Sequence, residues 1–462
     1  MKKTLSYILS LVIAVSTLFS FPALNTQAAV YEPDTKIYAE AYMLINLDDD
    51  SYPVVAEKNP DERLYPASLT KIVTAMVVLN KVKDLNATTT MSQSAFDATL
   101  GTGAQVAGIE VGEKLTIDML LKLTLVYSAC DASQVLAEYV SGDVKTFVNE
   151  MNTWVKSLGC NDTNFVNPDG LHDDNHYSTA SDMAKITLAA LKNSNFVKYS
   201  TTTSVEFHGM TLSHTNLMLS PGYTTYYYEY AQGIKTGSTE EADYCVITKA
   251  SKDGYNYLAV VMKSPRQRIN GESYETKCSF VDAKSLFEWA FNGLKYTTLI
   301  SQGEVISEIP VEDGKDADTV QLVAKEDVNV IVPAGLDKSA VIYDIVEKPE
   351  TLSAPVSKGQ EVCKANVIYG DMVVATVTLV TANDVELSTF LKVINAVKSF
   401  LGSTFVKIVL VVAFLLVIIY VFLFINNQKK KKRRRQKKIE RAMQREEQDN
   451  NPDDFLPPPA RR

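Results

Sequence analysis

The sequence predicts an α+β fold in which helices cover an antiparallel sheet, followed by a small all-β domain and a C-terminal transmembrane helix. Three observations support this prediction. Strand-like runs flank a helix-rich middle region, a second block of short strand-like runs follows it, and one long apolar run lies near the C-terminus. The chain has 462 residues, of which 46% are hydrophobic, and this suffices for two or three folded domains.

The first 29 residues are typical of a secretory signal peptide. Lys2 and Lys3 precede an apolar stretch over residues 9–21, and a small-residue stretch over residues 26–29 follows. An uncleaved anchor helix is the alternative, which the shortness of the apolar stretch disfavours.

Residues 30–295 are predicted to form the first domain. A helix is expected after Ser68, because apolar residues recur at three- and four-residue spacing at Ile72, Val73, Met76 and Leu79. Further helices are expected in residues 116–140, 143–158, 181–192 and 285–291, and strands in residues 39–46, 54–58, 245–250 and 257–262. Because strands occur at both ends of this domain, its two terminal regions are expected to share one antiparallel sheet.

Residues 296–383 are predicted to form the small β-rich domain. Strand-like runs separated by Gly, Pro and Asp turns cover residues 319–324, 328–332, 340–346, 365–369 and 373–380. Residues 384–403 are then expected to form an amphipathic linker helix, whose apolar face consists of Leu387, Leu391, Ile394, Val397 and Leu401.

Residues 404–426 are predicted to span a membrane. Residues 408–425 are apolar without interruption, and a helix of about 20 such residues crosses a bilayer core. The basic run 429–435 follows, which places the tail, residues 427–462, in the cytoplasm and the preceding domains outside the cell. A buried core helix is the alternative, and the adjoining charges disfavour it. The end of the tail, residues 455–459, is expected to be disordered.

The net charge of −9 is the sum of unequal parts. Residues 30–428 hold 31 basic and 49 acidic residues, a net of −18, whereas residues 429–462 hold 13 basic and 6 acidic residues. An acidic body disfavours nucleic acid as a partner, and a basic run beside a membrane span fits anionic lipids better. Five cysteines without any CxxC spacing are expected to be mainly buried thiols.

The most informative local pattern is Ser68-Leu69-Thr70-Lys71, directly after Pro66. Pro66 suits a helix start, and residues three apart on a helix share a face, so Lys71 would lie beside Ser68. A serine hydroxyl becomes a good nucleophile only when a base takes its proton, and a neutral lysine can be that base. Alone, this pattern also occurs by chance on many helices.

Two further motifs follow in order. Ser128-Ala129-Cys130 ends an apolar stretch about 60 residues later, and Lys235-Thr236-Gly237-Ser238 follows after about 107 more. The second adds a cation, a hydroxyl and a glycine that lets a substrate backbone approach closely. S-x-x-K, S-x-N and K-T-G in this order form a known catalytic signature.

With these motifs, the chain resembles the low-mass penicillin-binding proteins that are serine-type D-alanyl-D-alanine carboxypeptidases. Residues 66–71, 167–171, 176–180 and 233–238 are similar to that family's segments, and the resemblance covers nearly the whole chain. It implies a β-lactamase/transpeptidase-like catalytic domain, a β-rich domain and a C-terminal anchor. It also implies hydrolysis of peptidoglycan stem peptides through an acyl-enzyme, without a cofactor, and inhibition by β-lactams.

The resemblance further implies a role for each motif residue. Ser68 would attack the carbonyl between two terminal D-alanines, with Lys71 as proton acceptor and Ser128 as a relay toward the leaving amine. Lys235 and Thr236 would bind the terminal carboxylate, beside Gly237. The backbone N–H groups of Ser68 and Ser238 would form the oxyanion hole.

The second motif departs from the family's usual pattern. It normally ends in Asn, whose amide offers two donors and an acceptor, whereas Cys130 is a weak partner for either. We treat Cys130 as a substrate-binding variant of the motif rather than as a sign of a dead site.

Other patterns carry less chemistry. His172 and His176 have the spacing of a zinc pair but follow a turn-forming segment, so a structural loop is expected and no metal. Gly101, Gly103 and Gly108 lack the full dinucleotide fingerprint and are expected to lie in a loop.

Several functions compete with the carboxypeptidase hypothesis. A class A β-lactamase would need a glutamate base, and residues 167–176 contain aspartates but no glutamate. A β-lactam sensor would need a signalling domain, for which the 34 residues after position 428 are too few. A non-catalytic wall-binding protein and D,D-endopeptidase activity on cross-links stay open.

Overall fold

The computed structural model of the chain describes residues 30–267, 275–370 and 372–449. The predicted signal peptide, residues 1–29, and the end of the tail, residues 455–459, lie outside these ranges. Within these ranges the chain forms two compact units. One comprises the described residues of 30–306, 323–348 and 362–379, and the other comprises those of 307–322, 349–361 and 380–449.

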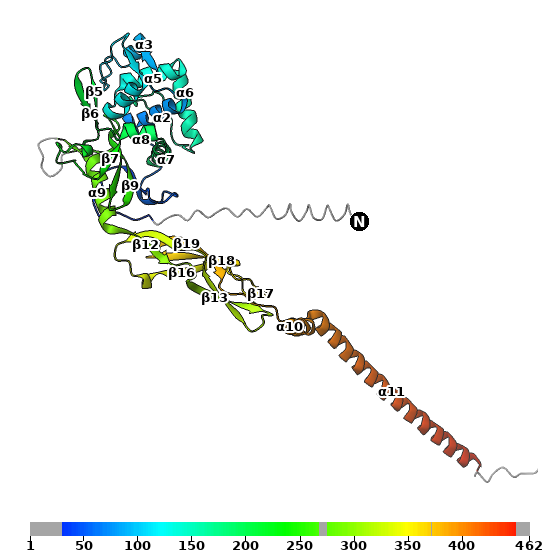
Figure 1. Ribbon diagram of the computed structural model, residues 1–462. Coiled ribbons are helices and arrows are strands. Elements are labelled where there is room, and N and C mark those ends of the chain that lie inside the picture. Colours follow the sequence, from blue (N-terminus) through cyan, green and yellow to red (C-terminus); the bar gives the residue numbers. More distant parts are fainter. Residues whose placement is uncertain (1–29, 268–274, 371, 450–462) are drawn as a thin grey trace, which may run out of the picture. The chain divides into compact units, whose positions relative to one another are not determined.

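The first unit is built around a five-stranded antiparallel sheet in the order β2-β1-β9-β8-β7 (Figure 1). The strands are β1 (Ala41–Asn46), β2 (Val54–Lys58), β7 (Ala231–Thr239), β8 (Asp243–Lys252) and β9 (Tyr255–Ser264). β1 pairs with β9 from Ala41↔Met262 to Asn46↔Tyr257, which confirms that strands from both ends of the first domain share one sheet. β7 is the end strand of this sheet.

Both faces of the sheet are covered, because β1 buries all of its residues. Met43 and Ile45 face a core built mainly from helices, whereas Tyr42 and Leu44 point the other way, toward a core with α9 (Cys278–Gly293). Successive side chains of a strand point to opposite faces, so an uninterrupted apolar strand fits between two layers.

The helices of the first core lie between β2 and β7 in sequence. They are α2 (Lys71–Lys81), α3 (Gln93–Asp97), α4 (Ile117–Lys122), α5 (Cys130–Ser141), α6 (Val144–Ser157), α7 (Ala180–Leu191) and α8 (Ser194–Ser200). They confirm the helices predicted in residues 116–140, 143–158 and 181–192. The helix predicted for residues 285–291 is the second half of α9, whose first half also packs its apolar residues on the sheet.

Short elements complete this part of the chain. The two-stranded pairs are β3 (Thr88–Thr90) with β4 (Lys114–Thr116), β5 (Ser204–Phe207) with β6 (Met210–Ser213), and β10 (Arg266–Gln267) with β11 (Thr276–Lys277). Single turns of helix are η1 (Ala67–Thr70), η2 (Leu123–Tyr127) and η3 (Leu217–Leu219).

The β-rich part consists of a pair, β12 with β15, and a six-stranded sheet in the order β16-β18-β19-β14-β13-β17. The strands are β12 (Leu294–Ile300), β13 (Val305–Glu312), β14 (Thr319–Ala324), β15 (Val328–Pro333), β16 (Ile342–Val346), β17 (Leu352–Ser353), β18 (Glu361–Tyr369) and β19 (Met372–Thr381), with η4 (Lys338–Ala340) before β16. All five predicted strands are present. β12 and β13 were not predicted, because their apolar residues are interrupted by several polar ones, and β17 was not predicted because it has only two residues.

Two helices end the described chain. α10 (Thr389–Gly402) begins after Leu387, which lies in a bridge with Gly314; the prediction that Leu387 belongs to the apolar face of this helix is therefore wrong. Ser388 caps the helix by accepting a hydrogen bond from the Leu391 N–H, and a capped start excludes the preceding residue.

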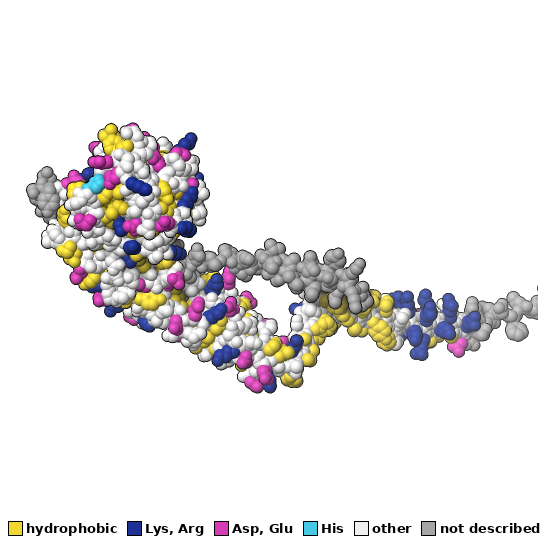
Figure 2. Space-filling model, turned by 45° about the horizontal axis from the view of Figure 1, so that its top comes forward, with side chains coloured by type: hydrophobic (Ala, Val, Ile, Leu, Met, Phe, Trp, Pro, Cys, Tyr) yellow, Lys and Arg dark blue, Asp and Glu magenta, His cyan; other side chains and the backbone are white. Residues whose placement is uncertain are grey.

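The last helix, α11 (Thr404–Asp449), carries a candidate membrane span with a mean hydropathy of 3.5 that is nowhere buried against the rest of the protein. Figure 2 shows its exposed apolar surface followed by a band of Lys and Arg side chains. The basic residues 429–445 continue the same helix. A C-terminal apolar helix of this kind is compatible with membrane anchoring.

Candidate active site

Ser68 lies in the tight turn η1, which leads directly into α2. Pro66 precedes this turn, as predicted, because its fixed φ suits a helix start. Ala67 has a φ of +48°, in the left-handed region that residues with a Cβ rarely adopt. The turn therefore places Ser68 just before α2. The strained backbone conformation at Ala67 must be stabilised by contacts with neighbouring residues.

Lys71 lies beside Ser68, as the three-residue spacing predicts. Its side chain is fully buried, and its Nζ lies 2.9 Å from Ser68 Oγ. The same Nζ donates to the backbone carbonyl of Asp169 at 2.5 Å and to Cys130 Sγ at 3.3 Å. Lys71 is thus within hydrogen-bond reach of the hydroxyl whose proton a base must take.

The second motif lies at a break between two helices. The turn η2 ends at Ser128, which has a φ of +68°, and α5 begins at Cys130. At this break Ser128 Oγ accepts a hydrogen bond from Lys235 Nζ at 2.8 Å. Ser128 and Lys235 are 107 positions apart in sequence but are in contact, so the second and third motifs share one site.

The third motif lies on β7, the end strand of the sheet. Lys235 is fully buried, and Thr236 Oγ1 donates a hydrogen bond to Thr215 Oγ1 at 2.6 Å. Gly237 packs against the nucleophile turn, since a Cβ at this position would lie 2.6 Å from the carbonyl oxygen of Pro66. The glycine is needed here for close approach of two backbones, rather than for an unusual φ.

Lys235 has a perturbed pKa. This pKa is lowered well below its ordinary value, first by burial and then by the positive charge of Lys71. A buried amine beside a second cation sheds a proton more easily than an exposed lysine. The amine whose pKa is lowered lies 2.8 Å from Ser128 Oγ.

Cys130 faces this lysine pair rather than solvent. Its side chain is buried, and burial is the main cause that raises the pKa of its thiol, although Lys71 opposes the shift. The thiol thus stays protonated and is a weak hydrogen-bond partner for Lys71, as the sequence predicts for a cysteine at this position.

Arg266, on β10, is a cation of the site that the sequence analysis missed. Its Nη2 donates to Ser238 Oγ at 2.7 Å and to the backbone carbonyl of Thr239 at 2.8 Å. Its guanidinium also stacks on the ring of Tyr244, 4.7 Å from the centroid. The only sequence signal is a lone arginine just after a predicted strand, which nothing distinguishes from a surface residue.

Asp131 fixes a loop beside the cleft, and the sequence did not indicate this role. Its buried carboxylate accepts hydrogen bonds from the backbone N–H groups of Ala107, Gly108, Ile109 and Ala132 at 2.9 to 3.1 Å. This loop, residues 101–109, contains the glycines predicted to lie in a loop. The loop is tied a second time at Gln105, whose carbonyl accepts the Cys130 N–H at 2.8 Å.

The two histidines of residues 167–178 lie in a loop, as predicted. His176 is buried and contacts Thr70, whereas His172 is partly exposed and lies edge-on to the ring of Tyr65. Within the described ranges 30–267, 275–370 and 372–449, no group of three or more His, Cys, Asp or Glu side chains could hold a metal ion. All five cysteines are buried and free, which confirms their prediction as thiols.

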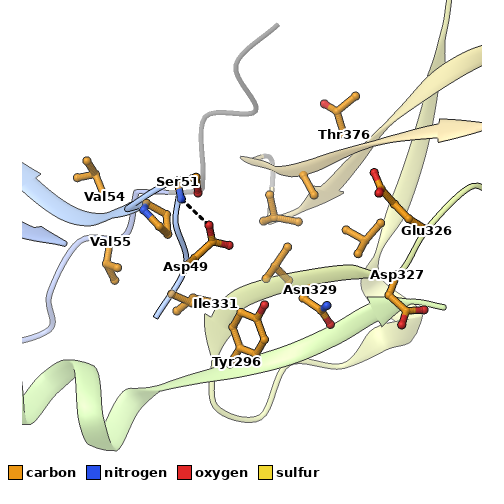
Figure 3. Close-up of a pocket in the computed structure, with 15 residues that line it drawn as sticks. Asp49, Ser51, Val54, Val55, Tyr296, Glu326, Asp327, Asn329, Ile331 and Thr376 are labelled. Carbon is orange, nitrogen blue, oxygen red and sulfur yellow. Dashed lines mark hydrogen bonds between the residues drawn. The ribbon is translucent and has the colours of Figure 1, made fainter. Parts of the chain in front are cut away.

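The predicted site residues, except the two buried lysines, line one cleft of about 820 Å³. Its walls include Ser68, Ser128, Cys130, Thr236 and Ser238. A smaller pocket of about 200 Å³, drawn in Figure 3, is lined by Asp49, Val55, Tyr296, Asn329 and other residues. That pocket contains none of the motif residues. The larger cleft, which contains Ser68, is therefore the candidate active site.

A serine hydroxyl within 2.9 Å of a buried lysine amine, next to a sheet covered by helices on both faces, is the arrangement expected of a serine peptidase that uses a lysine base. A family model described as Peptidase_S11, D-alanyl-D-alanine carboxypeptidase, matches residues 26–266, and one described as penicillin-binding protein 5, C-terminal domain, matches residues 294–387. The chain belongs to the Peptidase_S11 family and is a serine-type D-Ala-D-Ala carboxypeptidase.

Relatives and a solved structure agree with this assignment. The chain is 31% identical to the D-alanyl-D-alanine carboxypeptidase DacF of Bacillus subtilis, over 70% of this chain and 80% of the relative. It is 30% identical to the D-alanyl-D-alanine carboxypeptidase DacA of Haemophilus influenzae, over 82% of this chain and 92% of the relative. The crystal structure of penicillin binding protein 5 from Haemophilus influenzae matches with a TM-score of 0.57 and 29% identity, over 78% of this chain and all of that one. This fold confirms the predicted transpeptidase-like architecture.

Proposed function

We propose that the chain removes the terminal D-alanine from peptidoglycan stem pentapeptides through an acyl-enzyme on Ser68. The observation that carries this proposal is the 2.9 Å contact between Lys71 Nζ and Ser68 Oγ inside the cleft. Lys71 takes the Ser68 proton as Oγ attacks the carbonyl carbon of the last peptide bond. The C–N bond then breaks, and the amine of the departing D-alanine receives a proton through Ser128, which Lys235 holds at 2.8 Å.

The remaining site residues bind and polarise the substrate. Thr236 and Ser238 line the cleft, with Lys235 behind Thr236 and Arg266 bonded to Ser238, and these donors suit the carboxylate of the terminal D-alanine. The N–H groups of Ser68 and Ser238 stabilise the oxyanion, and β7, as an end strand, can pair with an extended peptide. Cys130 contacts Lys71 in place of the usual amide. Water then releases the shortened peptide, and a β-lactam, which imitates D-Ala-D-Ala, remains at the acyl stage.

The domain boundaries of this proposal are residues 30–295 for the catalytic domain and 296–383 for the β-rich domain. The two family matches, which end at residue 266 and begin at residue 294, support a boundary near residue 295. Residues 384–403 link this part to the membrane span.

The proposed location is a membrane with the catalytic domain outside the cell and the basic tail in the cytoplasm. The basic residues that follow the apolar part of α11 support this orientation through the positive-inside rule. α10 supports the membrane location, since Phe390, Val393, Val397 and Phe400 are each at least half exposed and share one apolar side. Such a helix lies at the headgroup level of a bilayer rather than in water. We expect the enzyme to trim the cell wall there and to contribute to cell shape.

Labelling with fluorescent penicillin and release of D-alanine from a diacetyl-Lys-D-Ala-D-Ala peptide test this function together. The wild-type protein is expected to be labelled and to release D-alanine, and Ser68→Ala is expected to lose both. Labelling without release, with loss of the label in Ser68→Ala, would favour the β-lactam sensor instead. No label at all would exclude both, and leave the non-catalytic wall-binding protein.

A further inference from the structure

The strained residue before the nucleophile has a specific support. Ala67 adopts a φ of +48°, and its carbonyl oxygen accepts a hydrogen bond from Thr70 Oγ1 at 2.7 Å. The same oxygen is in close contact with the backbone of Gly170, where a Cβ would lie only 2.0 Å away. The carbonyl of Ala67 is therefore held on two sides.

The carbonyl of Ala67 and the N–H of Ser68 belong to one planar peptide unit and point in opposite directions. Any rotation of this carbonyl rotates the Ser68 N–H by the same angle. Because that N–H is an oxyanion-hole donor in the proposed mechanism, the group that fixes the Ala67 carbonyl also aims the donor.

His176 completes the support from the other side. Its Nδ1 accepts the backbone N–H of Val166 at 3.2 Å, and its Nε2 lies 2.7 Å from Thr70 Oγ1. Since Nδ1 accepts, the proton of a neutral imidazole is on Nε2 and is donated to Thr70 Oγ1. Because Thr70 Oγ1 accepts this proton, its own hydroxyl proton is not directed at His176. It is donated to the Ala67 carbonyl oxygen instead.

The direction of this chain depends on a neutral His176. Only 2% of the side chain is exposed, and the pKa of His176 is lowered to about 4, mainly by burial. The positive charge of Lys71 acts in the same direction, and Asp173 opposes it. The imidazole is therefore neutral at the pH values at which a lysine base can act.

We propose that His176 and Thr70 are positioning residues that aim the Ser68 N–H at the oxyanion, through a chain of hydrogen bonds from Val166 to Ala67. The proposal rests on the proposed acyl-enzyme mechanism at Ser68. Neither side chain is among the residues that line the cleft, so we expect their effect to pass through the Ala67–Ser68 peptide unit rather than through contact with the substrate.

Thr70→Val tests this directly, because valine keeps the shape and loses the hydroxyl. The rate constant of acylation by a β-lactam is expected to fall roughly tenfold to a hundredfold, as for a weakened oxyanion-hole donor. The dissociation constant of the preceding non-covalent complex should stay unchanged, since Lys235, Thr236 and Arg266 are untouched. Thr70→Ser, which restores the hydroxyl, is expected to recover most of the rate.

Thr74→Val is the matched control. Thr74 is buried on α2, and its Oγ1 donates to the Pro168 carbonyl of the loop that contains His176, at 2.5 Å, rather than to the Ala67 carbonyl. If Thr74→Val slows acylation as much as Thr70→Val, or if Thr70→Val acylates at the wild-type rate, the positioning role is refuted.

A second pair of variants covers the case in which Thr70→Val does not fold. His176→Gln can still accept from Val166 and donate to Thr70, whereas His176→Phe can do neither, so only the latter should slow acylation. Equal acylation rates for the two would also refute the proposal. Failure of the underlying mechanism would show separately, as labelling that persists in Ser68→Ala.

Discussion

Gly237→Ala is the sharpest test of how the site is assembled. The substitution adds one methyl group at a position whose φ is not in the left-handed region, so backbone strain does not contribute. The new Cβ would lie 2.6 Å from the Pro66 carbonyl oxygen, 3.2 Å from Ala67 Cβ and 3.3 Å from the Leu69 nitrogen. All three neighbours belong to the turn that carries Ser68.

The size of the effect follows from these distances. Ordinary contact begins at 3.4 Å, so β7 and the nucleophile turn must separate by about 0.8 Å. The two N–H groups proposed for the oxyanion hole lie on these two segments, at Ser68 and Ser238. A misplacement of about 1 Å in a catalytic site can cost about 100-fold in rate, which corresponds to ~2.7 kcal/mol in the activation free energy. Overpacking should also destabilise the fold by about 1–3 kcal/mol.

The assay is the rate of acylation by fluorescent penicillin, measured at a temperature well below the unfolding midpoint of the variant. Gly222→Ala is the matched control, because its Cβ would meet only Ser220 Oγ, at 3.9 Å, and its φ is also outside the left-handed region. A folded Gly237→Ala protein that acylates at the wild-type rate would show that the contact between β7 and the turn does not set the geometry of the site.

Three further predictions concern residues around the cleft. Cys130→Asn is expected to retain or raise D-alanine release, because an amide is a better partner for Lys71 than a buried thiol; loss of turnover in a folded variant would give the thiol a role of its own. Lys235→Met is expected to abolish activity and to raise the unfolding temperature at pH 7. The pKa of Lys235 is lowered in the folded state, so the wild-type protein loses stability as the pH falls below the ordinary lysine value of 10.5. The advantage of the variant should therefore shrink between pH 7 and pH 10, and an advantage that does not change with pH would contradict this origin. Asp131→Ala leaves four backbone N–H groups without their acceptor and should destabilise the fold by about 3 kcal/mol or more, measured by denaturant unfolding; a loss below about 1 kcal/mol would show that water replaces the carboxylate.

Local patterns in the sequence predicted the scaffold of the site well. The apolar spacing after Ser68 predicted α2, and the strand-like runs 245–250 and 257–262 predicted β8 and β9. Both signals arise from neighbours in sequence, which follow the period of a helix or of a strand. The close contact between Lys71 and Ser68 follows in the same way, from three residues on one turn.

Contacts between distant residues could not be predicted in this way. Arg266, Asp131 and His176 act through partners 28, 24 and 106 residues away, respectively. Each belongs to a residue type that is common on surfaces or in turns, so its local sequence gives no sign of a buried or functional role. Only the packing of β10, α5 and the loop before α7 brings these side chains beside the segments that form the cleft.

The buried lysine pair links the stability of the fold to its chemistry. Within the described ranges, neither Lys71 Nζ nor Lys235 Nζ has a carboxylate among its hydrogen-bond partners. Burial and the positive charge of Lys71 both penalise the charged form of Lys235, so this lysine is an unfavourable core residue. A thiol at position 130 fits this arrangement, since burial raises its pKa and a neutral thiol supplies no negative charge that would stabilise a buried ammonium group. The energetic cost at Lys235 is therefore tied to the site that we propose for catalysis, and a substitution that relieves it should stabilise the fold while it removes the activity.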